Sequence, residues 1–208
     1  MSAFHQLVRR FPRRVPSFAP CLPLPAKEPP AGPDWIHEIK HDGFRIIGRR
    51  NGQRVRLFSR NGRDLTCRFP LIASAVAALP VSTCSIDGEA IICDDNGLSI
   101  FDLIRNPRRG DTATLRAFDI LELKSEDIRN WPIEDRKAVL KMLLQQAPHP
   151  GIAYNRHFDV EGSIVFHHAC KLGCEGIISK RFGSPYRSGR SDDWIKVENP
   201  KAVRINKG

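Results

Sequence analysis

The sequence predicts an α+β protein in which short strands alternate with a few helices. Hydrophobic residues alternate along residues 35–60, where Asp42-Gly43 and Asn51-Gly52 have the chemistry of hairpin turns. Apolar residues at helical spacing predict three helices, over residues 69–79, 130–146 and 162–172. A chain of 208 residues can bury a real core, as one domain or as two small lobes.

The order of the remaining segments suggests one domain between two irregular ends. Further strands are predicted over residues 84–92, 98–104, 152–158 and 175–180, and residues 112–123 are apolar. Residues 1–33 are rich in proline and arginine, so we expect an arm without regular structure. We therefore expect the folded domain over residues 34–199 and a basic tail over residues 200–208.

Composition favours a polyanionic partner and a reducing compartment. Lys and Arg number 33 against 23 Asp and Glu, which gives a net charge of +10. The N-terminal arginines are followed by prolines rather than an apolar run, so neither a secretory signal nor a membrane span is expected. The six cysteines are scattered, as in reduced cytosolic proteins. His167, Cys170 and Cys174 share one helix face, but their apolar neighbours favour core packing over a metal site.

The stretch Glu38–Arg45 is the strongest candidate for chemistry. An alternating hydrophobic run brings Lys40 to a strand end, immediately before Asp42-Gly43 and close to Arg45. A lysine nucleophile must be fixed in position and must react as the neutral amine, and a rigid strand end supplies the first requirement. Taken alone, an exposed hairpin tip carrying charges for solubility explains this stretch equally well.

Lys40-x-Asp-Gly-x-Arg45 resembles the signature of the covalent nucleotidyltransferases, which are ATP-dependent DNA ligases, RNA ligases and mRNA capping enzymes. The flanking Trp-Ile-His-Glu-Ile-Lys is most similar to bacterial ATP-dependent DNA ligases of the end-joining type. Further segments resemble that family in the same order along the chain: Ser59–Gly62, Asp87–Glu89, Ala117–Leu121, Glu175–Lys180 and Trp194–Glu198.

The resemblance implies a fold, a reaction and a substrate. The expected fold has two antiparallel β-sheets flanked by helices, with the nucleotide in the groove between them and Lys40 at its floor. In such ligases the lysine takes AMP from ATP, AMP passes to the 5′-phosphate of a nick, and the 3′-hydroxyl displaces it. Nicked or broken double-stranded DNA is therefore the expected partner, and other end-joining proteins are further candidate partners. We expect a monomer in the bacterial cytoplasm, associated with the nucleoid.

The same resemblance implies roles for individual residues, with ATP and Mg²⁺ (or Mn²⁺) as cofactors. The catalytic residues would be Lys40, Lys180 and Lys196. The nucleotide would contact Glu38, Arg45, Arg60, Glu89, Phe118 and Glu175, with Phe118 stacking on adenine, and Glu89 and Glu175 would also hold the metal. Read without the family, Phe118 is a core residue and Arg60 belongs to a turn. For Asp87-Gly-Glu89 a bulge with surface acids is the weaker reading, because hydrophobic residues flank it on both sides.

Two departures from the family keep other functions open. Relatives carry Lys-x-Lys where this chain has Lys196-Val-Glu198, so a charge of about +1 becomes about −1 at that position. Ligases of this kind also continue into an OB-fold domain, which is not expected within these 208 residues. A catalytically impaired module that binds nicks or DNA ends is the alternative. An RNA ligase or capping guanylyltransferase is disfavoured by the Ser59–Gly62 segment.

Overall fold

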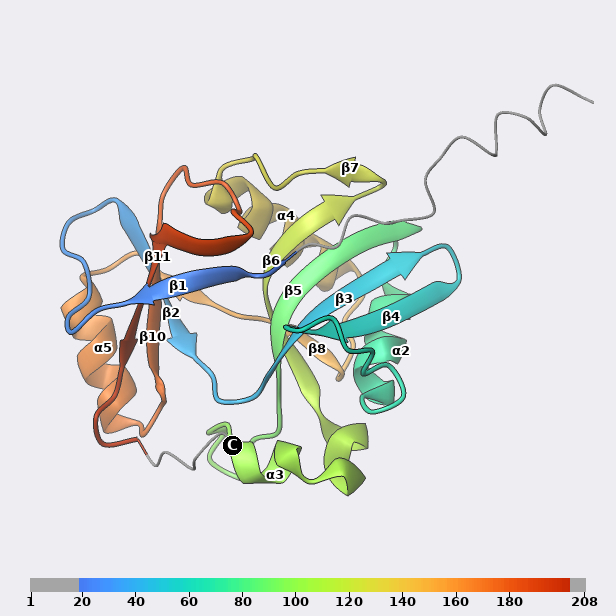
Figure 1. The fold of residues 1–208 in the computed structure, drawn as a ribbon, viewed down its shortest axis with the longest axis horizontal. Helices are drawn as coiled ribbons and strands as arrows, with labels where there is room; N and C mark the ends of the chain where they lie inside the picture. The colour runs from blue at the N-terminus through green and yellow to red at the C-terminus, as the bar shows by residue number, and fades with distance from the viewer. Residues whose placement is uncertain (1–18, 203–208) are drawn as a thin grey trace, which may run out of the picture.

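The computed structural model describes residues 19–202, in which two β-sheets lie side by side with helices packed against them (Figure 1). Apolar residues from both sheets meet between them, among them Ile36, Ile47 and Trp194. The α+β architecture with two sheets is therefore confirmed. In the described part of the chain, no helix has the length and apolar character needed to cross a membrane.

The first sheet contains five strands within the described residues, in the order β1-β11-β10-β2-β9. Their bounds are Cys21–Pro25 (β1), Gly189–Glu198 (β11), Gly176–Arg181 (β10), Trp35–Lys40 (β2) and His157–Phe158 (β9). Strand β1 runs parallel to β11, and the other pairs are antiparallel. Helix α5 (Gly162–Lys171) packs on this sheet through Val165 and Ala169, which meet Ile177 and Val197.

The second sheet has the order β4-β3-β5-β6-β7, and β8 pairs with β6 in parallel. Their bounds are Arg54–Ser59 (β4), Phe44–Asn51 (β3), Thr83–Ile91 (β5), Thr114–Leu123 (β6), Glu126–Asp127 (β7) and Ile152–Tyr154 (β8). Strands β3 and β4 pair from Asn51 and Arg54 onward, which confirms the Asn51-Gly52 hairpin.

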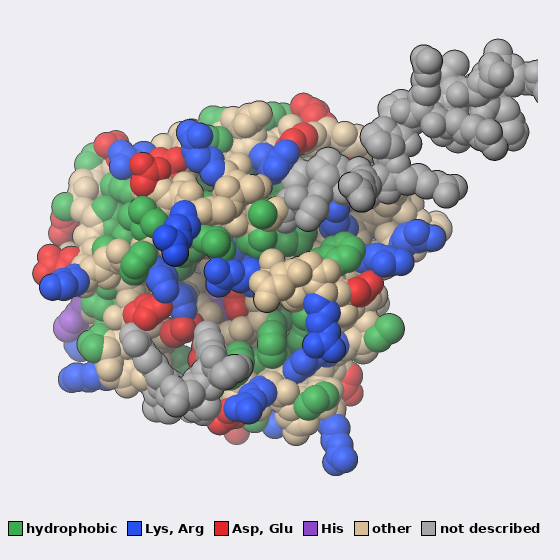
Figure 2. Space-filling model, viewed as in Figure 1, with side chains coloured by type: hydrophobic (Ala, Val, Ile, Leu, Met, Phe, Trp, Pro, Cys, Tyr) green, Lys and Arg blue, Asp and Glu red, His purple; other side chains and the backbone are tan. Residues whose placement is uncertain are grey.

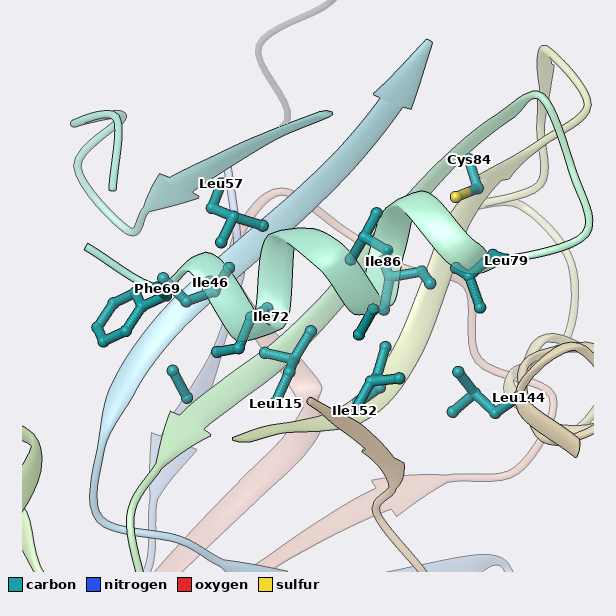
Figure 3. Close-up of a cluster of buried hydrophobic side chains, with 14 of the residues drawn as sticks. Ile46, Leu57, Phe69, Ile72, Leu79, Cys84, Ile86, Leu115, Leu144 and Ile152 are labelled. Carbon is teal, nitrogen blue, oxygen red and sulfur yellow. The ribbon is translucent and has the colours of Figure 1, made fainter. Parts of the chain in front are cut away.

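Three helices of the described residues flank the second sheet. Helix α2 (Pro70–Ala78) starts with proline, whose missing N–H has no partner to lose in a first turn, and it packs on β3 and β4. Figure 3 shows Ile72 of this helix beside Leu115 of the sheet. Helix α4 (Ile133–Gln146) packs on β6 and β8, and the short α3 (Phe101–Arg105) leads into a 3-10 turn over Pro107–Thr112.

The predicted hairpin at Asp42-Gly43 is wrong. Strands β2 and β3 belong to different sheets, because β10 and β9 flank β2 while β4 and β5 flank β3. Residues 41–43 therefore cross from one sheet to the other. Glycine is needed here for close packing, since a Cβ on Gly43 would lie 2.1 Å from the carbonyl oxygen of Ala90.

Other local predictions are corrected by partners far away in the chain. Cys21–Pro25, placed in an irregular arm, forms an edge strand. Its prolines are tolerated because, within residues 19–202, β1 pairs on one side alone. The predicted strand 98–104 is instead an isolated bridge at Ser99 followed by α3. The predicted strand 152–158 divides into β8 and β9, one in each sheet. The remaining parts of the expected arm and tail, residues 1–18 and 203–208, lie outside the described residues.

Two smaller expectations also change. The helix predicted over residues 130–146 begins at Ile133, because residues 128–131 form a turn that is closed by Trp131 N–H donating to Ile128 O, and Pro132 precedes the helix. Of the cluster on α5, His167 is exposed, whereas Cys174 packs against the apolar residues beneath the helix.

Candidate active site

A cleft of about 1180 Å³ lies between the two sheets. Figure 2 shows Lys and Arg side chains bordering the hollow in the middle of this face, with acidic side chains beside them. Each residue to which the resemblance gave a role lines this cleft: Glu38, Lys40, Arg45, Arg60, Glu89, Phe118, Glu175, Lys180 and Lys196. The fold thus brings together in one place residues that are distributed over most of the chain.

One wall of the cleft is a grid of residues that cross β2, β10 and β11 in register. Residues directly opposite each other on neighbouring strands share a face of the sheet. The three rows are Ile36–Lys180–Trp194, Glu38–Ile178–Lys196 and Lys40–Gly176–Glu198. Lys40 and Glu198 are therefore in one row, separated by the side-chain-free position of Gly176.

Lys40 ends β2 and forms an ion pair with Glu175, and both side chains are largely buried. The register places them together, because Gly176, the neighbour of Glu175, is the Cα partner of Lys40. Only glycine fits at this point, since Gly176 has φ +148 and a Cβ would lie 2.1 Å from Val197 O. The Glu-Gly pair of this motif therefore has a steric reason as well as a chemical one.

Two buried lysines share the carboxylate of Glu38. Lys137 Nζ donates to Glu38 Oε1 at 2.6 Å, and Lys180 Nζ donates to the same oxygen at 2.9 Å. Asn155 Nδ2 donates to Glu38 Oε2 at 3.1 Å. Burial would raise the pKa of Glu38, but the two lysines outweigh it and hold that pKa below its usual value. Burial lowers the pKa of Lys180 to about 8, even though Glu38 opposes the shift.

Arg45 is fixed by a carboxylate from the neighbouring strand. Its Nε and Nη2 donate to Asp87 at 2.5 and 2.7 Å, and Tyr186 Oη donates to Asp87 Oδ2 at 2.5 Å. The Cys21 backbone N–H donates to the Tyr186 hydroxyl at 2.9 Å, so β1 closes this network. Burial disfavours the charged guanidinium, but the contact with Asp87 wins and raises the pKa of Arg45. Asp87 is thus a buried positioning group, while Glu89 lines the cleft.

Phe118 is both a core residue and part of the cleft wall. Its side chain is 8% exposed and belongs to the apolar cluster between the sheets. The Arg45 guanidinium and the Lys180 ammonium each lie 4.5 Å from the ring centroid. The Trp194 ring meets Phe118 edge to face at 6.1 Å. Aromatic faces attract cations, so these rings help to hold both charges in place.

Glu198 lies in the cleft beside the lysine that it follows by two positions. Lys196 Nζ donates to Glu198 Oε1 at 2.9 Å, and each side chain is 31% exposed. The same two residues also border a smaller hollow of about 370 Å³ next to β1. An acid therefore occupies the region where a second phosphate-facing lysine was expected.

Five arginines complete the basic lining of the cleft: Arg60, Arg63, Arg68, Arg105 and Arg190. Arg60 and Arg63 are exposed, in the turn after β4, and Arg190 belongs to β11. Such a rim suits an extended polyanion, since guanidinium groups bind phosphate oxygens in a bidentate manner.

The donor set fits Mg²⁺ only if phosphate and water complete it. Glu89 and Glu175 both line the cleft, whereas residues 19–202 contain no group of three or more His, Cys, Asp and Glu side chains placed to hold a metal. Mg²⁺ in nucleotide-dependent enzymes is commonly bound through one or two carboxylates together with substrate phosphates and waters.

Several residues of this site were given no role from the sequence. Lys137 gave a usable signal, because it interrupts the apolar face of α4 between Ile133 and Leu140. Asn155 and Tyr186 gave none. Asn155 lies inside the predicted strand 152–158 and Tyr186 outside the predicted elements, and their partners are Glu38 and Asp87, 117 and 99 residues away in the chain.

Comparisons with known proteins point to the family that the motifs resemble. The model of the family described as "ATP dependent DNA ligase domain" matches residues 26–198. The multifunctional non-homologous end joining protein LigD of Pseudomonas aeruginosa is 37% identical over 183 residues, which cover 86% of this chain and 22% of that protein. The SPbeta prophage-derived DNA ligase-like protein LigB of Bacillus subtilis is 28% identical, with 87% of this chain and 67% of that protein covered.

A solved structure supports the same relationship. The mycobacterial DNA ligase D complexed with ATP and MES has a TM-score of 0.74 and 29% identity, covering 87% of this chain and 60% of that one. This chain thus spans 22% of the length of the Pseudomonas relative and 60% of the mycobacterial structure.

Proposed function

This chain belongs to the family of ATP-dependent DNA ligase domains, and we propose that it adenylates Lys40 and transfers the AMP to DNA ends. One observation carries the proposal. Lys40 sits at a strand end in contact with Glu175, in a basic cleft that Lys180 and Lys196 also line. That arrangement suits a nucleophile next to a phosphate chain.

In the first step, the Lys40 amine attacks the α-phosphorus of ATP. An N–P bond forms, the P–O bond to pyrophosphate breaks, and the amine loses a proton. Glu175 already contacts Lys40 and is positioned to accept that proton. Negative charge builds up on the α-phosphate and on the departing pyrophosphate, and Lys180, Lys196 and Arg45 are the cations that stabilise it.

Glu89 and Glu175 are the residues that would hold Mg²⁺ against the phosphates, and Mn²⁺ could substitute. The metal supplies positive charge to the phosphate oxygens when bound. Phe118 would stack on the adenine, and the base would then displace one of the two cations that now contact the ring. Glu38 would act at the adenine edge through its network with Asn155.

The later steps need a DNA end. The basic rim that includes Arg60 and Arg190 would hold the phosphate backbone, and AMP would pass from Lys40 to a 5′-phosphate before the 3′-hydroxyl displaces it. Relatives named for non-homologous end joining support nicked or broken double-stranded DNA as the substrate. We extend the proposal to a monomer that acts at the bacterial nucleoid alongside other end-joining proteins.

A second function is favoured by one contact. Glu198 pairs with Lys196 inside the cleft and removes positive charge from the place where the phosphates would lie. A domain with a weakened adenylation step could still bind nicks or ends through its arginine rim.

Incubation with α-labelled ATP and Mg²⁺, followed by a denaturing gel, tests the first step. We expect label on the wild type, none on Lys40→Ala, and unchanged label on Lys171→Ala, a matched exposed lysine on α5. Label on Glu198→Lys alone would favour the binding module. Absence of label from every variant would refute the enzyme. A nicked duplex that is already adenylated then tests sealing separately from the first step.

A further inference from the structure

We propose that Lys137 is a positioning residue that occupies Glu38 and thereby leaves Lys180 available to bind nucleotide phosphate. The inference rests on the proposed function, because it assigns Lys180 to the phosphates. Lys137 lies on α4, outside every motif that pointed to the reaction.

The hydrogen bonds of the two lysines are unequal. Lys137 Nζ donates to Glu38 Oε1 at 2.6 Å, to Phe118 O at 3.3 Å and to Asn155 O at 3.4 Å, which accounts for its three N–H groups. Among the described residues, Lys180 Nζ has one hydrogen-bond acceptor, Glu38 Oε1 at 2.9 Å. Its other neighbours are the rings of Phe118 and Trp194, at 4.5 and 4.1 Å. Lys137 is thus a saturated structural cation, whereas Lys180 retains donor capacity at the cleft wall.

The charges around this pair leave one cation in excess. Glu38 carries one negative charge and both lysines are 1% exposed, so the group has a net positive charge in a desolvated place. Asp119 and Arg45 also lie nearby, but they are paired with Arg136 and Asp87, respectively. The remaining titratable side chains around the group are those of Cys21, His41, Tyr154 and His157. Buried charge is costly unless it is compensated, and a phosphate entering the cleft supplies the missing counter-charge.

Lys137 therefore sets the charge state of its neighbour. Burial is the main cause of the lowered pKa of Lys180, Glu38 opposes it, and the charge of Lys137 lowers it further. Without Lys137, Glu38 and Lys180 form a neutral one-to-one pair. The pKa of Lys180 then rises, and Lys180 must leave its carboxylate before it can bind phosphate.

The test is a side-chain NMR titration of isotope-labelled lysines in the full chain, which needs no catalytic turnover. In the wild type, Lys180 should titrate near pH 8. In Lys137→Met, the midpoint should move upward by about one unit or more, as expected when a like charge within a few ångströms is removed. Lys137→Arg should restore the wild-type midpoint. Lys141→Met, an exposed position one turn further along α4, should leave it unchanged.

Calorimetric titration with pyrophosphate at pH 7 provides the second measurement. Lys137→Met should bind about tenfold more weakly, the value of roughly one charge-assisted hydrogen bond, and Lys141→Met should bind normally. An unchanged titration midpoint of Lys180 or an unchanged pyrophosphate affinity in Lys137→Met would overturn the inference. If the methionine variant does not fold, the same two measurements on Lys137→Gln decide it. A wild type that takes no AMP label but shows both effects would refute the proposed function alone.

Discussion

Replacing Glu198 by lysine should strengthen nucleotide binding, and the structure gives the magnitude. Glu198 holds Lys196 at 2.9 Å, with both side chains 31% exposed, so their pair contributes at most about 1 kcal/mol by itself. A freed Lys196 can donate to phosphate, which is worth about 1.5–3 kcal/mol for a charged hydrogen bond. Because both residues are partly exposed to water, the lower end of this range is expected for the hydrogen bond from Lys196 to phosphate.

The series Glu198→Gln and Glu198→Lys then predicts graded affinities. Each 1.4 kcal/mol corresponds to about a factor of ten, so the glutamine variant should bind ATP up to about tenfold more tightly. The lysine variant adds a second cation and should bind ATP roughly tenfold to a hundredfold more tightly than the wild type. Calorimetry in a Lys40→Ala background measures binding without AMP transfer, and the gain should shrink as salt screens these exposed charges.

Asp192→Lys is the matched control, because it makes the same charge change at an exposed position of β11 that does not line the cleft. Equal gains from the two lysine variants would attribute the effect to net charge rather than to the contact with Lys196. A Glu198→Lys variant that binds ATP no better than the wild type would refute the reasoning.

Three further predictions concern the buried charges. Arg136 and Asp119 are both fully buried, and Arg136 Nε and Nη2 donate to the Asp119 carboxylate at 2.8 and 2.9 Å. Arg136→Met should therefore lower the free energy of unfolding, measured in urea, by about 3–5 kcal/mol. Adding Asp119→Leu should recover most of that loss. A wild-type midpoint in the single variant would contradict this. Asp87→Asn removes the charge that holds Arg45 and should lower the free energy of unfolding by about 2–4 kcal/mol. Scanning fluorimetry should show this as a fall in Tm of roughly 5–15 °C. A fall below about 2 °C would show that the pair is not stabilising. Because the folded pKa of Glu38 lies below its unfolded value near 4.5, Glu38 stabilises the fold above that value, and the contribution is lost as pH falls through the folded pKa. Glu38→Gln should therefore show a flatter fall in unfolding free energy at acid pH, and parallel curves for variant and wild type would exclude this role.

Much of the site could be recognised from residue types and their order. The Lys40 motif, the Glu175 motif and the others are short, and each chemical group is set by the residue itself. Their common place in one cleft follows from strand ends and registers that these short segments share. Helices α2, α4 and α5 were also predictable, because an apolar face at helical spacing is a local property.

The pairing of distant segments was not predictable in this way. Asp42-Gly43 and Asn51-Gly52 have the same turn chemistry, yet the first connects two sheets and the second forms the turn of a hairpin. The difference arises because β2 finds β10, more than a hundred residues later, and no local pattern encodes that choice. Lys137 reaches Glu38 across 99 residues for the same reason. The residue types determine the reactive groups, whereas long-range packing determines which partners position them and set their charge states.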